Sequence, residues 1–320
     1  MNIEEIQPYL ASALEKTNFD FLGKRTQGKV RDVYDAGDKL YLVATDRYSA
    51  FDRNLTLIPL KGQALTQTTL FNFSQTEDII QNHVISNPDP NVIVCKKCTV
   101  APVEVIVRGY LTGVTDTAIW TRYQKGQRDF TDFVLNDGMV KNTKLMHPVV
   151  TPTTKFEEHD RNLTFAEIVE GNYLTLKQWK EIYETALLLF ARGQEVAKRS
   201  GLILVDTKYE FGYDTDGKLV LIDEIHTQDS SRYWKEDTYR DRMSKAEQPE
   251  YSDKEFLRLW FKEHCDPYAD KVLPDAPDDM RLELARRYIE IYEKLSLHTF
   301  QPPALGDTEA RIRSSLVSTI

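Results

Sequence analysis

Acidic side chains with a lysine between them dominate residues 205–234, which read VDTKYEFGYDTDGKLVLIDEIHTQDSSRYW. The Asp216-Gly217 dipeptide fits the two-residue type I′ turn of a β-hairpin. Counting outward from such a turn sets Glu210 directly opposite Asp223. Strand alternation then adds Asp206 and Lys208 to the same face. The pattern predicts one apolar face and one face that carries chemistry.

The opposed carboxylates of this hairpin repel each other unless a cation lies between them. A pair of oxygen ligands suits Mg²⁺, which takes one or two carboxylates and completes its shell with water and phosphate oxygens. The alternative is a solvent-exposed strand face with scattered charge, which is common in hairpins. An exposed face would be expected to alternate charges across the ladder, so we favour Mg²⁺ bound by Glu210 and Asp223.

Composition narrows the class of protein. The 320 residues are 41% hydrophobic, which is enough for a proper core in one large domain or two. A net charge of −9 argues against general affinity for nucleic acid or an anionic membrane, so any phosphate is bound locally. The sequence begins without a signal-peptide pattern and has no membrane-spanning apolar run. Three cysteines cannot build a disulfide framework, and we predict a cytoplasmic protein.

A second hairpin is predicted over residues 28–45. Gly28 is followed by Lys29 and Arg31 at strand spacing, so two cations on one face beside a flexible residue could cover a polyphosphate. The alternative is an ordinary charged hairpin, because the full phosphate-loop pattern is missing. Later, Arg108 ends a predicted strand over 100–107, where it is either a surface charge or a clamp for phosphate or carboxylate.

The remaining elements are predicted from periodicity. Residues 121–160 contain glycines and two prolines and are predicted to form loops with short strands. A long helix is predicted to start at Thr175, with a capping box to Gln178, and to stop at Gly201. Two more amphipathic helices are predicted around 256–261 and 282–295. His226 falls on the apolar face of the acidic hairpin, which favours a packed or hydrogen-bonded residue over a catalytic base.

Five motifs occur along the chain in a specific order. They are GKVRDVY (28–34), DRYSAFD (46–52), PVEVIVRGYLTG (102–113), DTKYEFG (206–212) and DEIHTQDSSRYW (223–234). Together they resemble the SAICAR synthase (phosphoribosylaminoimidazole-succinocarboxamide synthase) family of purine biosynthesis. The resemblance implies ATP-dependent ligation of L-aspartate to the carboxylate of carboxyaminoimidazole ribotide (CAIR), which gives SAICAR, ADP and phosphate.

The same resemblance implies the architecture. It is an α+β, two-lobed fold with an antiparallel β amino-terminal lobe over 1–107 and a larger α+β lobe over 108–320. The ATP cleft is expected between the two lobes. The expected partners are the small molecules CAIR and L-aspartate, together with ATP and Mg²⁺; the oligomeric state is not predicted.

The matched motifs also imply the site residues. For ATP they are Gly28, Lys29, Arg31 and, near the adenine, Glu104; for Mg²⁺ they are Glu210 and Asp223. For the ribotide phosphate they are Arg108, Ser231 and Arg232, with Asp229 on the substrate side; for the L-aspartate pocket, the candidates are Asp46 and Ser49. Lys208 and Asp206 are expected near the reacting carboxylate. One departure is Val114, which stands where the family commonly has serine.

Two rival functions differ in class. A kinase-like phosphotransferase would also use magnesium-binding acids and a Gly-Lys hairpin, but no H-R-D catalytic loop precedes the acids. A nucleotide-binding regulator without turnover is disfavoured because Lys208, Glu210, Asp223 and Arg232 are all present.

Overall fold

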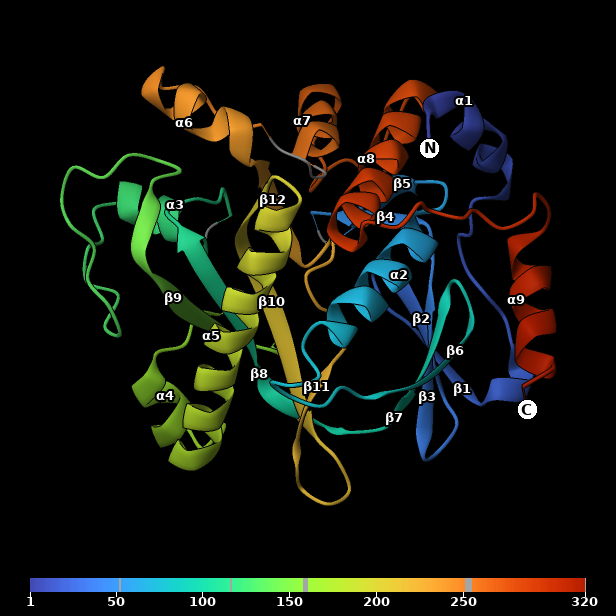
Figure 1. The fold of residues 1–320 in the computed structure, drawn as a ribbon, viewed down its shortest axis with the longest axis horizontal. Helices are drawn as coiled ribbons and strands as arrows, with labels where there is room; N and C mark the ends of the chain where they lie inside the picture. Colours follow the sequence, from blue (N-terminus) through green and yellow to red (C-terminus); the bar gives the residue numbers. More distant parts are fainter. Residues whose placement is uncertain (52, 116, 158–160, 251–254, 320) are drawn as a thin grey trace. The chain divides into compact units, whose positions relative to one another are not determined.

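The computed structural model describes residues 1–51, 53–115, 117–157, 161–250 and 255–319 (Figure 1). The chain divides into two compact units. The first comprises Met1–Phe71, His83–Lys97 and Ser252–Ile320, and the second comprises Asn72–Asn82 and Cys98–Tyr251. Each unit has an antiparallel sheet and helices of its own, so the predicted α+β class is confirmed.

The main sheet of the first unit has the strand order β1-β2-β3-β7-β6 and is antiparallel throughout. Its strands are β1 (Lys24–Gln27), β2 (Arg31–Asp35), β3 (Lys39–Ala44), β6 (Val84–Asp89) and β7 (Val92–Lys96). The β2–β3 turn fits its sequence, because Gly37 has a φ of 96° and the Asp35 carboxylate accepts its N–H at 3.0 Å. The predicted hairpin over 28–45 is confirmed for β2 and β3. Residues 28–30 instead form the turn before β2, so the prediction that Lys29 and Arg31 lie at strand spacing is wrong.

A two-stranded ribbon and several helices complete the first unit. They are β4 (Arg47–Ala50), β5 (Arg53–Leu57), α1 (Ile3–Ile6), α2 (Lys61–Ser74), α7 (Glu255–His264), α8 (Asp278–Ser296), α9 (Thr308–Val317) and short 3₁₀ turns at Gln7–Ser12 and Asp20–Leu22. Helix α8 buries Leu284 and Tyr288 in one core with Tyr48 of the ribbon. Ile312 of α9 packs against the main sheet in a second core. Helices α7 and α8 confirm the two predicted tail helices, whereas α9 was not predicted.

The sheet of the second unit runs β11-β10-β8-β9, with β12 also paired to β10. Its strands are β8 (Thr99–Tyr110), β9 (Lys144–Thr154), β10 (Leu202–Tyr213), β11 (Leu219–Ile222) and β12 (Ser231–Lys235). The prediction of loops over 121–160 missed β9. Pro152 is tolerated inside this strand because β9 is the edge strand of its sheet, where a missing N–H costs no ladder hydrogen bond.

Helix α5 (Leu176–Arg199) supports this sheet and contacts β10, β8 and β9 (Figure 1). Its start is as predicted: the Thr175 side chain accepts from Gln178 N, and the Gln178 side chain accepts from Thr175 N. Gly201 follows its end with a φ of 68°. The other helices of the unit are α3 (Ile119–Gln124), α4 (Phe165–Glu170) and α6 (Glu236–Ser244).

The two units differ from the predicted division at 107/108. That boundary lies inside β8, which is one continuous strand of the second unit. The segment after residue 251 also belongs to the first unit, since α8 and α9 pack their apolar faces there. The boundaries of the two units therefore depend on contacts between residues that are far apart in the sequence.

The register of the acidic hairpin differs by one residue from the prediction. Strand β10 pairs Glu210 with Ile222, not with Asp223. The Asp214 carboxylate accepts the N–H groups of residues 216 and 218, and Gly217 N donates to Asp214 O. Only Gly217 in this turn has a positive φ, of 74°. The loop is thus a three-residue turn closed by an aspartate side chain, and the predicted two-residue turn is wrong.

Candidate active site

Four charged side chains form a cluster on one face of the second sheet. Glu104 on β8 stands directly opposite Glu210 on β10, so acid does face acid, but the partner strand is β8. Lys208 Nζ lies 2.8 Å from Glu104 Oε1 and 2.6 Å from Glu210 Oε1. Lys155 Nζ, just after β9, lies 2.5 Å from Glu210 Oε2 and 3.5 Å from Glu104 Oε1. Two ammonium groups thus neutralise two opposed carboxylates.

The electrostatics of the cluster follow from this arrangement. Burial alone would raise the pKa of Glu210, but Lys208 and Lys155 outweigh burial and lower that pKa to about 2. Burial would lower the pKa of Lys208, but Glu210, Glu104 and Asp223 together raise it. The pKa of Glu104 is raised, chiefly by its burial. At neutral pH Glu210 is a carboxylate and Lys208 is an ammonium.

A second cluster on the same face joins two arginines to one acid. Asp206 on β10 is in register with Arg108 on one side and with Arg232 on the other. Asp206 Oδ2 lies 2.7 Å from Arg232 Nη1 and 3.7 Å from Arg108 Nη1. Arg108 also donates from Nε to Thr151 Oγ1 at 2.8 Å. Burial lowers the pKa of Arg108 to about 10, so the group stays charged and the cluster is net positive.

Asp223 directly follows β11 and has a left-handed backbone conformation with a φ of 65°. Such a conformation is uncommon for a non-glycine residue and occurs at functional sites. Asp223 is one of the charges that raise the pKa of Lys208, so the two side chains are near each other. Asp223 is therefore near the face that carries Lys208, although the predicted pairing of Asp223 with Glu210 is wrong.

The loop between Asp223 and β12 carries the predicted substrate residues. Asp229 is half-buried in this loop. Ser231 pairs with Thr207 and donates to its hydroxyl at 2.7 Å, so its side chain lies on the face opposite to Asp206. His226 is fully buried, and its Nε2 lies 2.6 Å from the Tyr209 hydroxyl. The prediction that His226 is packed and hydrogen-bonded is confirmed; burial lowers its pKa to about 3.

The carboxylates of Glu210 and Asp223 fit a hard divalent cation that takes only some of its ligands from the protein. Within the described part of the chain, no three or more His, Cys, Asp or Glu residues gather as metal ligands. Mg²⁺ commonly needs only one or two carboxylates, with phosphate oxygens and water as the other ligands. An ionised Glu210 and a nearby Asp223 supply that number of carboxylates.

Of the residues predicted for ATP, Gly28, Lys29 and Arg31 lie in the first unit, whereas Glu104 lies on β8 of the second. Gly28 and Lys29 are exposed in the turn between β1 and β2, which the Gly28 N–H closes by donating to the Arg31 carbonyl at 2.8 Å. Asp46 is buried, and its carboxylate accepts the backbone N–H of Leu14 at 2.7 Å and of Gly62 at 2.8 Å.

Burial raises the pKa of Asp46 to about 6, against the lowering effect of those two amides. Ser49 is half-buried in β4, at a shift in the register with β5. The DRYSAFD motif that contains both residues ends at residue 52, which lies outside the described residues.

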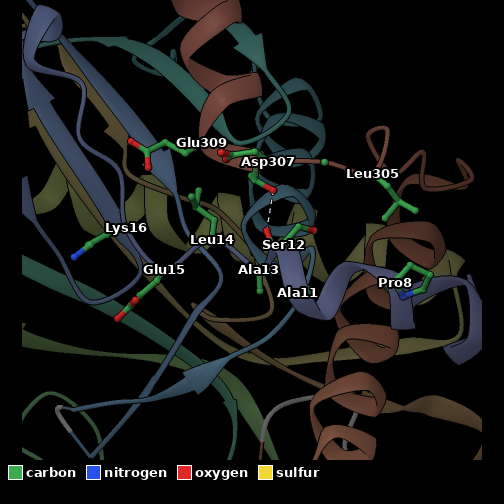
Figure 2. Close-up of a pocket in the computed structure, with 12 residues that line it drawn as sticks. Pro8, Ala11, Ser12, Ala13, Leu14, Glu15, Lys16, Leu305, Asp307 and Glu309 are labelled. Atoms are coloured by element: carbon green, nitrogen blue, oxygen red, sulfur yellow. Dashed lines mark hydrogen bonds between the residues drawn. The ribbon is translucent and has the colours of Figure 1, made fainter.

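An open pocket of about 590 Å³ also lies in the first unit (Figure 2). It is lined by Pro8, residues 11–16 and residues 305–309. The Thr308 hydroxyl donates to the Ser12 carbonyl across it at 2.9 Å, the dashed line in Figure 2. The predicted site residues are all described, and none of them lines this pocket.

The comparisons with known proteins agree with one another. A family model described as SAICAR synthetase matches residues 24–274. The chain is 53% identical over 287 residues to the phosphoribosylaminoimidazole-succinocarboxamide synthase of Legionella pneumophila (strain Lens), covering 90% of this chain and 92% of that protein. It is 54% identical over 295 residues to the chloroplastic enzyme of Arabidopsis thaliana, covering 91% and 72%. The chain belongs to the SAICAR synthetase family.

A solved structure supports the same assignment for this SAICAR synthetase family member. The SAICAR synthase of Saccharomyces cerevisiae, complexed with SAICAR, matches with a TM-score of 0.77 and 30% identity over 91% of this chain and 100% of that one. The resemblance seen in the five motifs is confirmed, as is the activity that it implies: ATP-dependent amide formation between CAIR and L-aspartate. Among the described residues, no helix has the length and apolar character needed to cross a membrane.

Lys155 is the member of the charged cluster that the sequence analysis did not predict. It follows Thr153 by two positions, and Thr153 is in register with Glu104, so strand alternation puts Lys155 on the Glu104 face. The signal was present in the stretch TPTTK at 151–155. It could be used only after 144–154 was known to be a strand.

Proposed function

We propose that the face carrying Glu104, Lys155, Lys208 and Glu210 is the reaction centre of the ligation. The single observation that supports this most strongly is the pair of lysines held between two opposed acids, beside an arginine pair on the same sheet face. Such a site combines positive charge for phosphoryl oxygens with carboxylates for a metal ion.

The chemistry requires activation of a poor electrophile. A carboxylate oxygen of CAIR attacks the γ-phosphorus of ATP, ADP leaves, and an acyl phosphate forms. The L-aspartate amine then attacks the acyl carbon, the amine gives up a proton, and inorganic phosphate leaves as the amide forms. Phosphoryl transfer of this kind depends mainly on positioning and on charge neutralisation.

The two lysines are proposed to supply that neutralisation. Lys208 remains protonated because its pKa is raised, so it stabilises negative charge on the transferring phosphoryl group and on the reacting carboxylate. Lys155 shares Glu210 with it and is proposed to act on the same oxygens. Glu104 accepts from Lys208 and is proposed as a positioning residue for that ammonium, in place of a contact to the adenine.

Glu210 and Asp223 are proposed to hold Mg²⁺ together with nucleotide phosphate oxygens. When bound, the ion supplies positive charge to the phosphates of ATP. The low pKa of Glu210 supports this role, because the carboxylate is ionised without a metal. The left-handed conformation of Asp223 turns the chain immediately after β11, at the position of the second proposed carboxylate ligand.

Arg108 and Arg232 are proposed to bind the ribotide phosphate. Their guanidinium groups suit phosphate oxygens, and Asp206 holds both of them. Asp206 is therefore assigned to orienting the arginines. Ser231, through Thr207, positions the strand that carries Arg232, and Asp229 is proposed to contact substrate from the adjoining loop.

In the first unit, Gly28, Lys29 and Arg31 are proposed to cover the ATP phosphates, and Ser49 to contact L-aspartate. Asp46 is proposed to act indirectly by holding the segments at Leu14 and Gly62.

The test is ADP release by the full chain with ATP and Mg²⁺, with CAIR and L-aspartate both present and with each omitted. We expect sustained ADP release and SAICAR formation only with both substrates. Steady ADP release without L-aspartate, with a phosphorylated product, would instead support the kinase-like phosphotransferase. Nucleotide binding without any turnover would support the regulator.

A further inference from the structure

Arg47, the first residue of β4, is a buried cation outside the proposed reaction centre. Its side chain is 1% exposed and pairs with Asp32, whose side chain is fully buried, at 3.0 Å between Nη2 and Oδ1. Asp32 Oδ2 also accepts from Thr17 N at 2.7 Å and from Arg25 Nη2 at 3.1 Å. A buried charge pair persists only where further hydrogen bonds satisfy it, so the other donors of Arg47 need acceptors.

Those acceptors are backbone carbonyls: two in the turn between β1 and β2, and one at Glu15, in the segment before β1. Arg47 Nη2 donates to the Gly28 carbonyl at 3.0 Å and Nε donates to the Lys29 carbonyl at 3.3 Å. Nη1 donates to the Glu15 carbonyl. The rigid fork of a guanidinium can serve several acceptors in one plane, which the single nitrogen of a lysine cannot.

Two consecutive carbonyls held on one side constrain the peptide planes of the turn. In a trans peptide the C=O and the following N–H point in opposite directions. With the Gly28 and Lys29 carbonyls directed at Arg47, the N–H groups of Lys29 and Val30 are directed away from it. Successive amide N–H groups that share a direction form an anion-binding concavity.

We infer that Arg47 is a positioning residue for nucleotide binding, and that its guanidinium fixes the peptide planes of residues 28–30 so that the N–H groups of Lys29 and Val30 meet the polyphosphate of a nucleoside di- or triphosphate. The inference rests on the proposed role of Gly28, Lys29 and Arg31 over the ATP phosphates. It adds a residue that never touches the nucleotide.

The test compares Arg47→Lys with Arg25→Met in the full chain. Arg47→Lys keeps a cation beside Asp32 and loses the fork; we expect the Kd for ADP and the KM for ATP to rise about tenfold, as expected for the loss of charge-assisted hydrogen bonds. The KM values for CAIR and L-aspartate should not change. Arg25 contacts the same Asp32 but none of the turn carbonyls, so Arg25→Met should lower the melting temperature without weakening ADP binding.

Equal ADP affinity in Arg47→Lys and the unchanged protein would overturn the inference. If Arg47→Lys fails to fold, hydrogen exchange of the unchanged protein decides: the Lys29 and Val30 amides should gain protection on ADP binding, and no gain would refute it. Lys29→Met separates the two proposals. Should Lys29→Met leave ADP binding intact, the proposed nucleotide site is wrong; should it weaken binding while Arg47→Lys does not, only the Arg47 inference fails.

Discussion

Glu104 and Glu210 stand opposite each other on neighbouring strands, and both accept a hydrogen bond from the Lys208 ammonium, at 2.8 Å and 2.6 Å. Like charges in register destabilise a sheet unless they are neutralised. Here the ammonium groups of Lys208 and Lys155 lie between the two carboxylates and neutralise them, so the opposed acids do not destabilise the sheet. In the proposed complex, phosphate oxygens would replace carboxylates as partners of the lysines, and the metal ion would replace lysines as a partner of Glu210. No buried charge would then be left unpaired.

Glu104→Gln tests whether this acid serves Lys208 or the adenine. The amide oxygen can still accept from Lys208 but carries no charge, so we expect kcat to fall about tenfold and the KM for ATP to stay constant. Steady-state kinetics with each substrate varied provides the measurement. An increased KM for ATP at unchanged kcat would favour the contact to adenine.

Lys155→Met should remove one of the two ammonium groups next to Glu210. We expect kcat to fall by about 10²-fold or more, because one preorganised charge near the transferring phosphoryl group is lost. The matched control is Lys144→Met, which alters an exposed lysine at the start of the same strand and should retain activity. Similar losses in both variants, or none in Lys155→Met, would contradict the assignment.

Local signals in the sequence predicted several elements well. The capping box at Thr175, the glycine after α5 and the β2–β3 turn each depend on residues close in sequence, and each is present as predicted. The face of β10 that carries Asp206, Lys208 and Glu210 follows from strand alternation alone, and it is also as predicted.

Non-local pairing limited the prediction of the site. The acid opposite Glu210 comes from β8, more than a hundred residues earlier in the chain, and no turn links the two strands to fix their register. Lys155 was missed because prolines at 148 and 152 favoured a loop, and a proline is acceptable in a strand only at a sheet edge. The hairpin register was wrongly predicted because turn propensities consider only backbone conformation. Here the Asp214 side chain accepts two backbone N–H groups of the turn and stabilises a longer loop.

Asp223→Asn tests the proposed metal ligand. Asparagine tolerates a left-handed backbone as aspartate does, so the variant should fold with an unchanged melting temperature. Loss of the carboxylate should abolish most Mg²⁺-dependent turnover and raise the Mg²⁺ concentration needed for half-maximal rate. Asp216→Asn, in the exposed turn of the same hairpin, is the control and should behave like the unchanged protein. Full activity of Asp223→Asn at low Mg²⁺ would exclude the metal role.

Asp46→Asn should change how the stability of the protein depends on pH. Burial raises the pKa of Asp46 from 3.8 to about 6, so the folded state binds a proton that the unfolded state has released. The stabilising contribution is complete below the unfolded pKa and is lost as pH rises through about 6. Relative to Asp46→Asn, the unchanged protein should lose roughly 2 kcal/mol of unfolding free energy between about pH 4.5 and pH 7.

Urea unfolding of both proteins across that pH range gives this difference directly, because contributions from other groups cancel. Asp35→Asn is the control of opposite sign, since the hydrogen bond from Lys97 lowers the pKa of Asp35, and its stabilising contribution is lost as pH falls. A pH-independent difference between the unchanged protein and Asp46→Asn would mean that Asp46 is ionised throughout, with its charge fully stabilised by the amides of Leu14 and Gly62.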